Sequence, residues 1–141
     1  MRTTSPPDLA GHLRHTVVRT ARRLRQEAGG ELSPSLTAAL STVERHGPLT
    51  PSEVALRERI QRPTATRVLA RLEEEGLIGR TPDPQDRRSS LVAVTDQGRE
   101  LLDELRTRKT AFLAARLEAL DPEERATVAR AADILEGMLA E

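Results

Sequence analysis

Residues 49–78 read LTPSEVALRERIQRPTATRVLARLEEEGLI, and this stretch decides the fold. Thr50 is a typical N-cap, followed by a proline and then by a glutamate that completes a capping box. The pattern predicts a short helix over about residues 51–58, a tight turn, and a second helix over about residues 63–75. Two capped helices joined in this way are common, so the neighbouring segments must decide their role.

The second helix has well-marked ends and two distinct sides. Pro63 opens it, Gly76 ends it, and Leu77 is placed to fold back onto Leu72 as the apolar partner of a glycine cap. One side is apolar and must face a core; it carries Ala65, Val68, Leu69 and Leu72. The opposite side is small and polar; it carries Pro63, Thr64, Thr66, Arg67, Ala70 and Arg71.

The small polar side of this helix fits the major groove of duplex DNA. Arg67 and Arg71 can reach guanine edges or phosphates, while Thr64 and Thr66 can bond a phosphate or a base or touch a thymine methyl. The helix N-terminus adds a partial positive charge that favours phosphate. The plain alternative is an ordinary surface helix of a small bundle.

Two apolar runs after this helix predict a β-hairpin, with strands over roughly residues 77–81 and 90–95. The loop between them, residues 82–89, is longer than the two to five residues of most hairpin loops. From residue 83 the sequence reads DPQDRRSS, with two adjacent arginines at the tip. An extended, charged loop of this kind is typical of a binding element.

Helix, turn, helix and two-stranded wing is the order of a winged helix. An arginine at the wing tip, Arg87 or Arg88, can enter a narrow minor groove, where negative potential is concentrated. Asp86 then either orients an arginine by ion pairing or shapes the tip. The alternative is a solvated loop with local ion pairs.

The rest of the chain predicts further helices, three of which begin after the N-caps Ser33, Thr95 and Asp121. Apolar residues recur at helical spacing in the first 28 residues and again beyond residue 101. The expected fold is mostly α, an α+β winged helix with about six helices and a two-stranded β-wing. The apolar faces of the end helices are broader than a small monomer needs, which indicates dimerisation.

The composition of the chain excludes several classes of function. The chain has no cysteine, which excludes disulfides, thiolate metal sites and thiol redox sensing. Phe112 is the only aromatic residue. Proteins that bind single strands or RNA usually stack bases on aromatic side chains, so duplex DNA is the favoured nucleic-acid partner. Neither a membrane span nor a signal peptide is visible, so we expect a cytoplasmic protein with no membrane partner.

The formal net charge is zero, but the charges are unevenly distributed. Residues 1–30 carry six basic and two acidic side chains, whereas residues 96–141 carry seven basic and eleven acidic ones. Lys109 is the single lysine among 22 basic residues, and the others are arginine, which suits bidentate contact with guanine or phosphate. Codon bias in a GC-rich genome explains the same excess of arginine.

Two motifs are similar to those of the MarR family of bacterial transcription regulators, and the likeness covers nearly the whole chain. Residues 49–80, with RPTATR at the start of the second helix, resemble the helix-turn-helix of that family. Residues 83–101, DPQDRRSSLVAVTDQGREL, resemble its wing signature of an aspartate, arginines, an apolar strand, Thr95 and Gly98.

The resemblance implies a homodimer that binds a pseudo-palindromic operator, acts as a repressor and is released by a small aromatic or anionic effector. It implies dimerisation helices over residues 1–32 and 96–141, with a DNA-binding region over residues 33–95. The effector pocket is expected between the first, second and fifth helices.

The resemblance also assigns roles in the wing. Asp86 and Arg88 form the aspartate-x-arginine pair of the family, with Arg88 in the minor groove. Arg87 is an extra basic residue for the groove or a phosphate, and Ser89 completes the DNA-binding set. Two other functions remain open: a winged-helix protein–protein interaction module without DNA binding, and a DNA-binding protein without an effector.

Other chemistry has little support in the sequence. His12 and His15 share a helix face with Asp8 one turn earlier, which fits either a zinc site or a pair of surface histidines. Asp83 and Asp86 lack the glycine and distal glutamate of a calcium loop. No nucleophile–base spacing or glycine-rich phosphate loop is present, so no enzymatic activity, metal or cofactor is expected.

Overall fold

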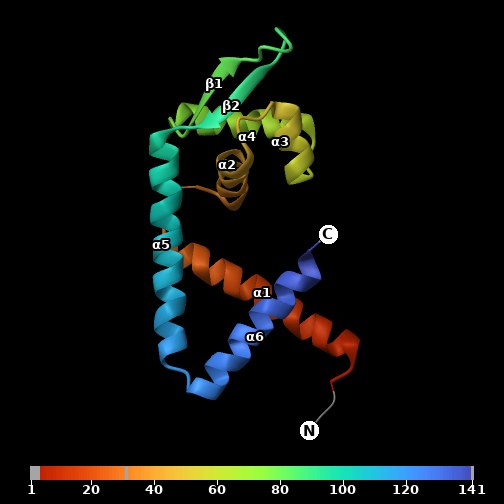
Figure 1. The fold of residues 1–141 in the computed structure, drawn as a ribbon, viewed down its shortest axis with the longest axis vertical. Helices are drawn as coiled ribbons and strands as arrows, with labels where there is room; N and C mark the ends of the chain where they lie inside the picture. The colour runs from red at the N-terminus through yellow and green to blue at the C-terminus, as the bar shows by residue number, and fades with distance from the viewer. Residues whose placement is uncertain (1–3, 31, 141) are drawn as a thin grey trace.

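The structure of the protein, a computed structural model, describes residues 4–30 and 32–140. Within these residues it contains six helices and one two-stranded antiparallel sheet (Figure 1). The mostly helical fold with a β-wing that the sequence predicts is confirmed. The elements are α1 (Pro6–Ala28), α2 (Pro34–His46), α3 (Pro51–Glu58), α4 (Arg62–Glu74), β1 (Ile78–Pro82), β2 (Ser90–Val94), α5 (Asp96–Glu118) and α6 (Pro122–Leu139).

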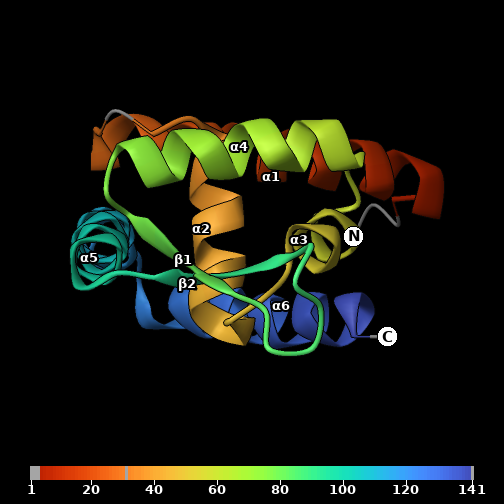
Figure 2. The same cartoon turned by 90° about the horizontal axis from the view of Figure 1, so that it is seen from above.

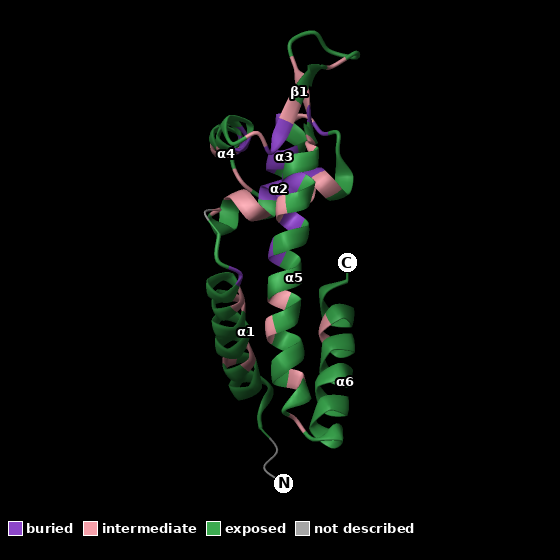
Figure 3. Ribbon diagram, turned by 90° about the vertical axis from the view of Figure 1, so that its left-hand side faces the viewer, coloured by how far each residue is buried: buried purple, intermediate pink, exposed green. Residues whose placement is uncertain are grey.

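The long helix α5 joins two parts of the molecule that differ in burial. At one end α2, α3, α4 and the sheet pack together, and at the other end α1 and α6 lie near the second half of α5 (Figure 1). Most buried residues belong to the first part, whereas α6 has none among its described residues (Figure 3). The helix-turn-helix and wing therefore have a core of their own, and the end helices do not.

The apolar side of α4 forms the centre of this core. Ala65, Leu69 and Leu72 are each 0% exposed, which confirms the predicted core side of the second helix, and Val68 is half-buried at its edge. The side chains that surround them come from α2, α3, α5, the wing and the adjoining turns: Ala39, Leu40, Val43, Leu49, Val54, Leu77, Ile78, Val92 and Leu102.

A glycine cap turns the chain from α4 into the wing. Gly76 has a φ of 75°, in the left-handed region that glycine adopts without strain. Its N–H donates to the Glu73 carbonyl and the Leu77 N–H donates to the Leu72 carbonyl, both at 2.9 Å, which are the two bonds of a Schellman motif. The predicted return of Leu77 toward Leu72 is confirmed. Because Leu77 completes the cap, β1 starts one residue later than predicted.

The wing is an antiparallel pair whose register joins Ile78 to Val94 and Pro82 to Ser90. Pro82 therefore belongs to the strand, and the loop covers residues 83–89 rather than 82–89. At the base of the wing Leu49 bridges Val92, with backbone N–H···O bonds of 3.0 and 2.7 Å in the two directions. The segment before α3 thus fixes the lower end of the wing.

The start of α5 docks against the end of α4. Thr95 caps α5, donates its hydroxyl to the Gly76 carbonyl at 2.7 Å and donates its N–H to the Leu77 carbonyl at 3.0 Å. Gly98 is buried here, and a Cβ at this position would lie 2.2 Å from the Leu77 carbonyl oxygen. Only glycine permits this approach without a backbone shift.

The predicted N-caps are confirmed for the helices that follow Ser33, Thr50, Thr95 and Asp121. Each of these side chains accepts a hydrogen bond from the backbone N–H three residues further on. At Thr50 the capping box is complete, because the Glu53 side chain also accepts the Thr50 N–H. The bond from the Glu124 N–H holds the pKa of the Asp121 carboxyl below its usual value.

The start of α4 differs from the prediction by one residue. The helix begins at Arg62 rather than at Pro63, and Gln61 forms no side-chain cap. Proline fits this second position because its missing N–H would have no partner within the first turn in any case. The N-terminal end of α4 is therefore left open to an outside hydrogen-bond acceptor.

We expect Leu69→Ala to lower the free energy of unfolding by about 2–5 kcal/mol, because it leaves a cavity at the centre of the core. Denaturant unfolding at a fixed protein concentration measures this change. Leu56 on α3 is 79% exposed, so Leu56→Ala serves as the control and should change stability by less than about 0.5 kcal/mol. Equal losses for the two variants would contradict the burial of Leu69.

Candidate nucleic-acid interface

The outward side of α4 lies at the end of the molecule that also carries the wing (Figure 1). Viewed along α5, the helices α3 and α4 and the wing lie in front of α1 and α6, with α4 along one side and the wing loop along the other (Figure 2). The nine predicted DNA-binding residues are all accessible: Thr64 and Ser89 are half-buried, and Pro63, Thr66, Arg67, Arg71, Asp86, Arg87 and Arg88 are exposed.

The two arginines predicted to face the groove differ in their surroundings. The Arg67 side chain has no ion pair or hydrogen bond with any other described residue. The Arg71 guanidinium lies 3.0 Å from a Glu75 carboxylate oxygen and 3.9 Å from one of Glu74. Such exposed pairs on one helix contribute only about 0.3–0.5 kcal/mol, so a phosphate can compete for Arg71. Arg67 is free to contact DNA without breaking a contact first.

The N-terminal end of α4 carries a contact that sequence reasoning missed. The Arg62 guanidinium donates to the Ser52 hydroxyl on α3, which holds the charged group at the edge of the helix-turn-helix. The Thr66 hydroxyl donates to the Arg62 carbonyl at 3.0 Å. The RPTATR motif marks Arg62 at the start of the second helix. The motif does not indicate the partner of Arg62, Ser52, because this contact depends on the packing of α3 on α4.

The wing tip is shaped by its two aspartates. The Asp86 carboxylate accepts the Arg88 N–H at 2.9 Å, and its carbonyl accepts the Ser89 N–H at 3.0 Å. The Asp83 carboxylate accepts the Gln85 N–H at 2.9 Å. Within the described residues Asp86 forms no ion pair with either arginine, so it shapes the loop rather than pairing with a guanidinium. Arg87 and Arg88 remain exposed at the tip.

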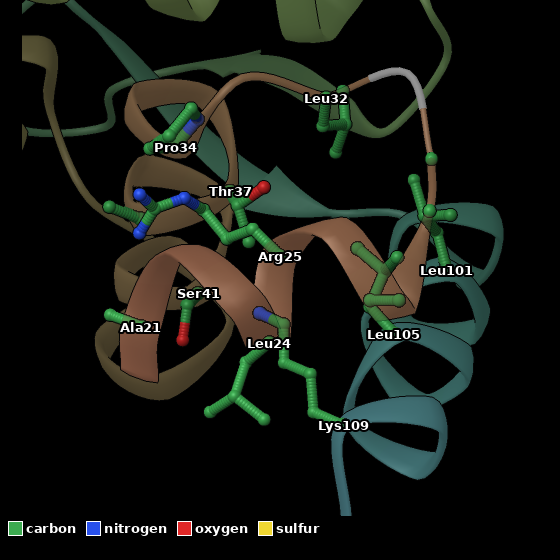
Figure 4. Close-up of a pocket in the computed structure, with 14 residues that line it drawn as sticks. Ala21, Leu24, Arg25, Leu32, Pro34, Thr37, Ser41, Leu101, Leu105 and Lys109 are labelled. Atoms are coloured by element: carbon green, nitrogen blue, oxygen red, sulfur yellow. The ribbon is translucent and has the colours of Figure 1, made fainter. Parts of the chain in front are cut away.

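A second feature lies between the DNA-binding part and the end helices. A cavity of about 320 Å³ opens between α1, α2 and α5, the helices between which the family resemblance implies an effector pocket (Figure 4). Leu24, Leu101 and Leu105 give it apolar walls, and Arg25 and Lys109 add positive charge. A pocket of this size with few polar groups suits a small, largely apolar ligand with one negative group.

The described residues contain neither a metal-binding cluster nor a membrane-spanning helix. No group of three or more histidine, cysteine, aspartate or glutamate side chains is arranged there to hold a metal ion, and His12 and His15 are exposed on α1. None of the described helices is both long enough and apolar enough to cross a bilayer.

The helix-turn-helix, the arginine-bearing wing and the accessible outer side of α4 together define a winged-helix DNA-binding protein. The family model described as MarR family matches residues 32–90. Over 128 residues, 90% of each chain, the protein is 38% identical to an uncharacterized HTH-type transcriptional regulator of Mycobacterium bovis. The chain belongs to the MarR family of DNA-binding transcriptional regulators.

Solved structures show the same fold. A Pseudomonas aeruginosa protein described as a transcriptional regulator superposes with a TM-score of 0.85 at 34% sequence identity, over 98% of this chain and 100% of that one. A mutant of Staphylococcus aureus MepR bound to an oligodeoxyribonucleotide has a TM-score of 0.72 at 20% identity, over 92% of this chain and 97% of that one. At that identity the second likeness concerns the fold alone.

We expect Arg67→Ala to relax base choice and to weaken binding by about 1–3 kcal/mol, whereas Arg71→Ala should cost less than about 1 kcal/mol because Arg71 already has partners. Selection of binding sites from random duplexes reports base choice, and fluorescence anisotropy reports affinity. An unchanged preferred sequence for Arg67→Ala, or a larger loss for Arg71→Ala, would contradict this ranking.

Proposed function

We propose that the protein is a homodimeric repressor that binds a pseudo-palindromic operator and is released by a small aromatic or anionic effector. In each subunit α4 lies in the major groove and the wing reaches the adjacent minor groove. The residues assigned to DNA contact are Pro63, Thr64, Thr66, Arg67, Arg71, Asp86, Arg87, Arg88 and Ser89. Occupation of promoter DNA by such a dimer blocks transcription until the effector lowers its affinity.

One observation carries the DNA-binding assignment. Arg67 on α4 and Arg87 and Arg88 in the wing loop are exposed, and their side chains pair with no described residue. The helix α4 and the wing lie at the same end of the molecule (Figure 1). Unpaired guanidiniums on a helix and a neighbouring hairpin suit a phosphate-rich partner that offers both base edges and a narrow groove. A protein partner would need apolar area at the centre of this surface, which the outer side of α4 lacks.

The homodimer is supported by the end helices. Large apolar side chains on α1 and α6 are exposed to an extent that a stable monomer rarely tolerates: Leu9 52%, Val17 48%, Val18 59%, Ile134 53%, Met138 66% and Leu139 81%. The first 30 residues are also basic and the last 46 acidic, so association of α1 with α6 of a second copy is electrostatically favourable. A two-fold dimer then reads half-sites centred about 10 bp apart.

The effector assignment is supported by the position and chemistry of the cavity. Its walls come from α1 and α5 and from α2, which packs directly on α4. A ligand that separates these walls would change the position of α4 relative to α5 and therefore the spacing of the two reading helices in a dimer. The Lys109 ammonium and the Arg25 guanidinium suit a carboxylate, and the leucines suit an aromatic ring.

The main alternative is a winged-helix module that binds another protein. A salt titration separates the two. A DNA-binding dimer that makes about 6–10 phosphate contacts should lose about 10³–10⁵ in affinity between 50 and 200 mM salt, whereas an apolar protein contact responds weakly. The absence of any salt-sensitive binding to duplex DNA would favour the protein module.

Arg88→Ala tests the wing assignment. We expect a loss of about 1–3 kcal/mol in operator binding, because the minor-groove contact is removed, with the dimer intact. Anisotropy titration on a selected operator and analytical ultracentrifugation measure the two properties. Unchanged binding would refute a role for Arg88 in the groove.

Lys109→Met tests the effector assignment with benzoate, the simplest aromatic carboxylate, as the probe. We expect benzoate to weaken operator binding of the wild-type protein, and Lys109→Met to weaken benzoate binding by about 1.5–3 kcal/mol, the range for a hydrogen bond to a charged group. Calorimetry measures the binding. Lys109→Arg keeps the charge and is the control. A benzoate response that is the same in all three proteins would place the ligand elsewhere.

A further inference from the structure

Arg80 occupies a particular position in the wing. In the sheet register it pairs with Val92, so its side chain leaves the same face as Ile78 and Val92. Ile78 is 2% exposed and Val92 is 0% exposed, because this face packs on the body of the domain. The Arg80 side chain is 29% exposed. It therefore lies where the hairpin leaves the core and begins to project.

The Arg80 guanidinium joins three elements at this point. Its Nε donates to the carboxylate of Glu73 on α4. Its Nη1 donates to the Ser90 hydroxyl on β2 at 3.4 Å. A single side chain of β1 thus contacts both the helix that faces the major groove and the opposite strand of the wing.

Among the described residues, no hydrogen bond or ion pair connects the wing loop beyond Arg80 to the rest of the domain. In the described part of the chain, the hydrogen bonds of residues 83–89 are all internal to the wing: Asp83 with Gln85 and Ser89, and Asp86 with Arg88 and Ser89. An isolated two-stranded hairpin is only marginally stable and changes its twist easily. The contact of Arg80 with Glu73 is therefore placed to set the angle between the wing and α4.

We propose that Arg80 is a positioning residue for DNA binding. It holds the wing at the angle at which Arg88 reaches the minor groove while α4 lies in the major groove. Without this contact each element still binds, but the wing must be ordered at the moment of binding, which lowers affinity. The proposal rests on the proposed function and concerns only the geometry between the two contacts.

A direct contact of Arg80 with a phosphate is the competing explanation, and Glu73 separates the two by the sign of its effect. Removal of a negative charge near DNA strengthens binding if electrostatics alone operates. Removal of the partner that holds Arg80 weakens binding if Arg80 positions the wing. Glu73→Gln keeps the size of the side chain and makes this distinction.

The experiment compares Glu73→Gln with Glu74→Gln on the duplex that the wild-type protein selects from random DNA. Glu74 is the next residue of α4 and pairs with Arg71 of the same helix rather than with Arg80 of the wing, so it is the matched control. We expect Glu73→Gln to weaken binding about two- to fivefold, the range for an exposed ion pair, and Glu74→Gln to leave it unchanged or slightly tighter. Thermal unfolding of each variant checks that the fold is kept.

A double-mutant cycle gives a second readout. In the Glu73→Gln protein the loss caused by Arg88→Ala should be at least twofold smaller than in the wild type, because the wing is no longer held in place. The charge exchange Glu73→Arg with Arg80→Glu should restore binding relative to Arg80→Glu alone.

Tighter or unchanged binding by Glu73→Gln, or strictly additive losses with Arg88→Ala, would overturn the proposal. The proposed function would still stand in that case, provided that the wild-type protein binds the duplex and Arg88→Ala weakens it. Failure of the wild-type protein to bind any duplex would instead refute the proposed function itself.

Discussion

The fold depends on the burial of one side of α4. Ala65, Leu69 and Leu72 lie against α2 and the sheet with no exposed surface. Full burial of a leucine side chain stabilises a fold by about 1.5–3 kcal/mol, and a rotation of the helix would forfeit this for several residues at once. The rotational setting of α4 is therefore fixed, and Arg67 on its opposite side must face outward. The position of the surface that we propose contacts DNA therefore follows from the packing of the core on the other side of α4.

The same constraint extends to the wing. Gly76 turns the chain with a positive φ, Leu77 returns to the core, and Thr95 donates its hydroxyl to the Gly76 carbonyl. The buried Gly98 lets α5 approach the Leu77 carbonyl. The wing therefore leaves the body in a direction that the end of α4 and the start of α5 define together. This packing explains the spacing of Thr95 and Gly98, which resembles the wing signature of the family.

Local signals in the sequence predict the helices and strands and most of their ends. The capped starts at Ser33 and Thr50 and the glycine stop at Gly76 involve residues within a few positions of each other, and each was predicted. The start of the wing loop and the first residue of α4 each differ from the prediction by one residue, because a proline fits more than one position in a strand or a first helical turn.

The contacts of the arginines were not predictable in the same way. Arg71, Arg62 and Arg80 all carry the same charge in a sequence rich in arginine, yet the first pairs along its own helix, the second with α3 and the third with α4. Long side chains choose among several nearby acceptors according to the tertiary arrangement, which the sequence pattern does not contain. The residues that line the cavity between α1, α2 and α5 could not be predicted for the same reason.

The position of Lys109 has a practical consequence. It is the only amine-bearing side chain in a chain of 141 residues, and it lines the cavity between α1, α2 and α5. A reagent that acylates lysine amines would modify Lys109 as the single lysine of the sequence. The rate of that modification would report whether the cavity is occupied, without a label elsewhere in the molecule and without knowledge of the natural ligand.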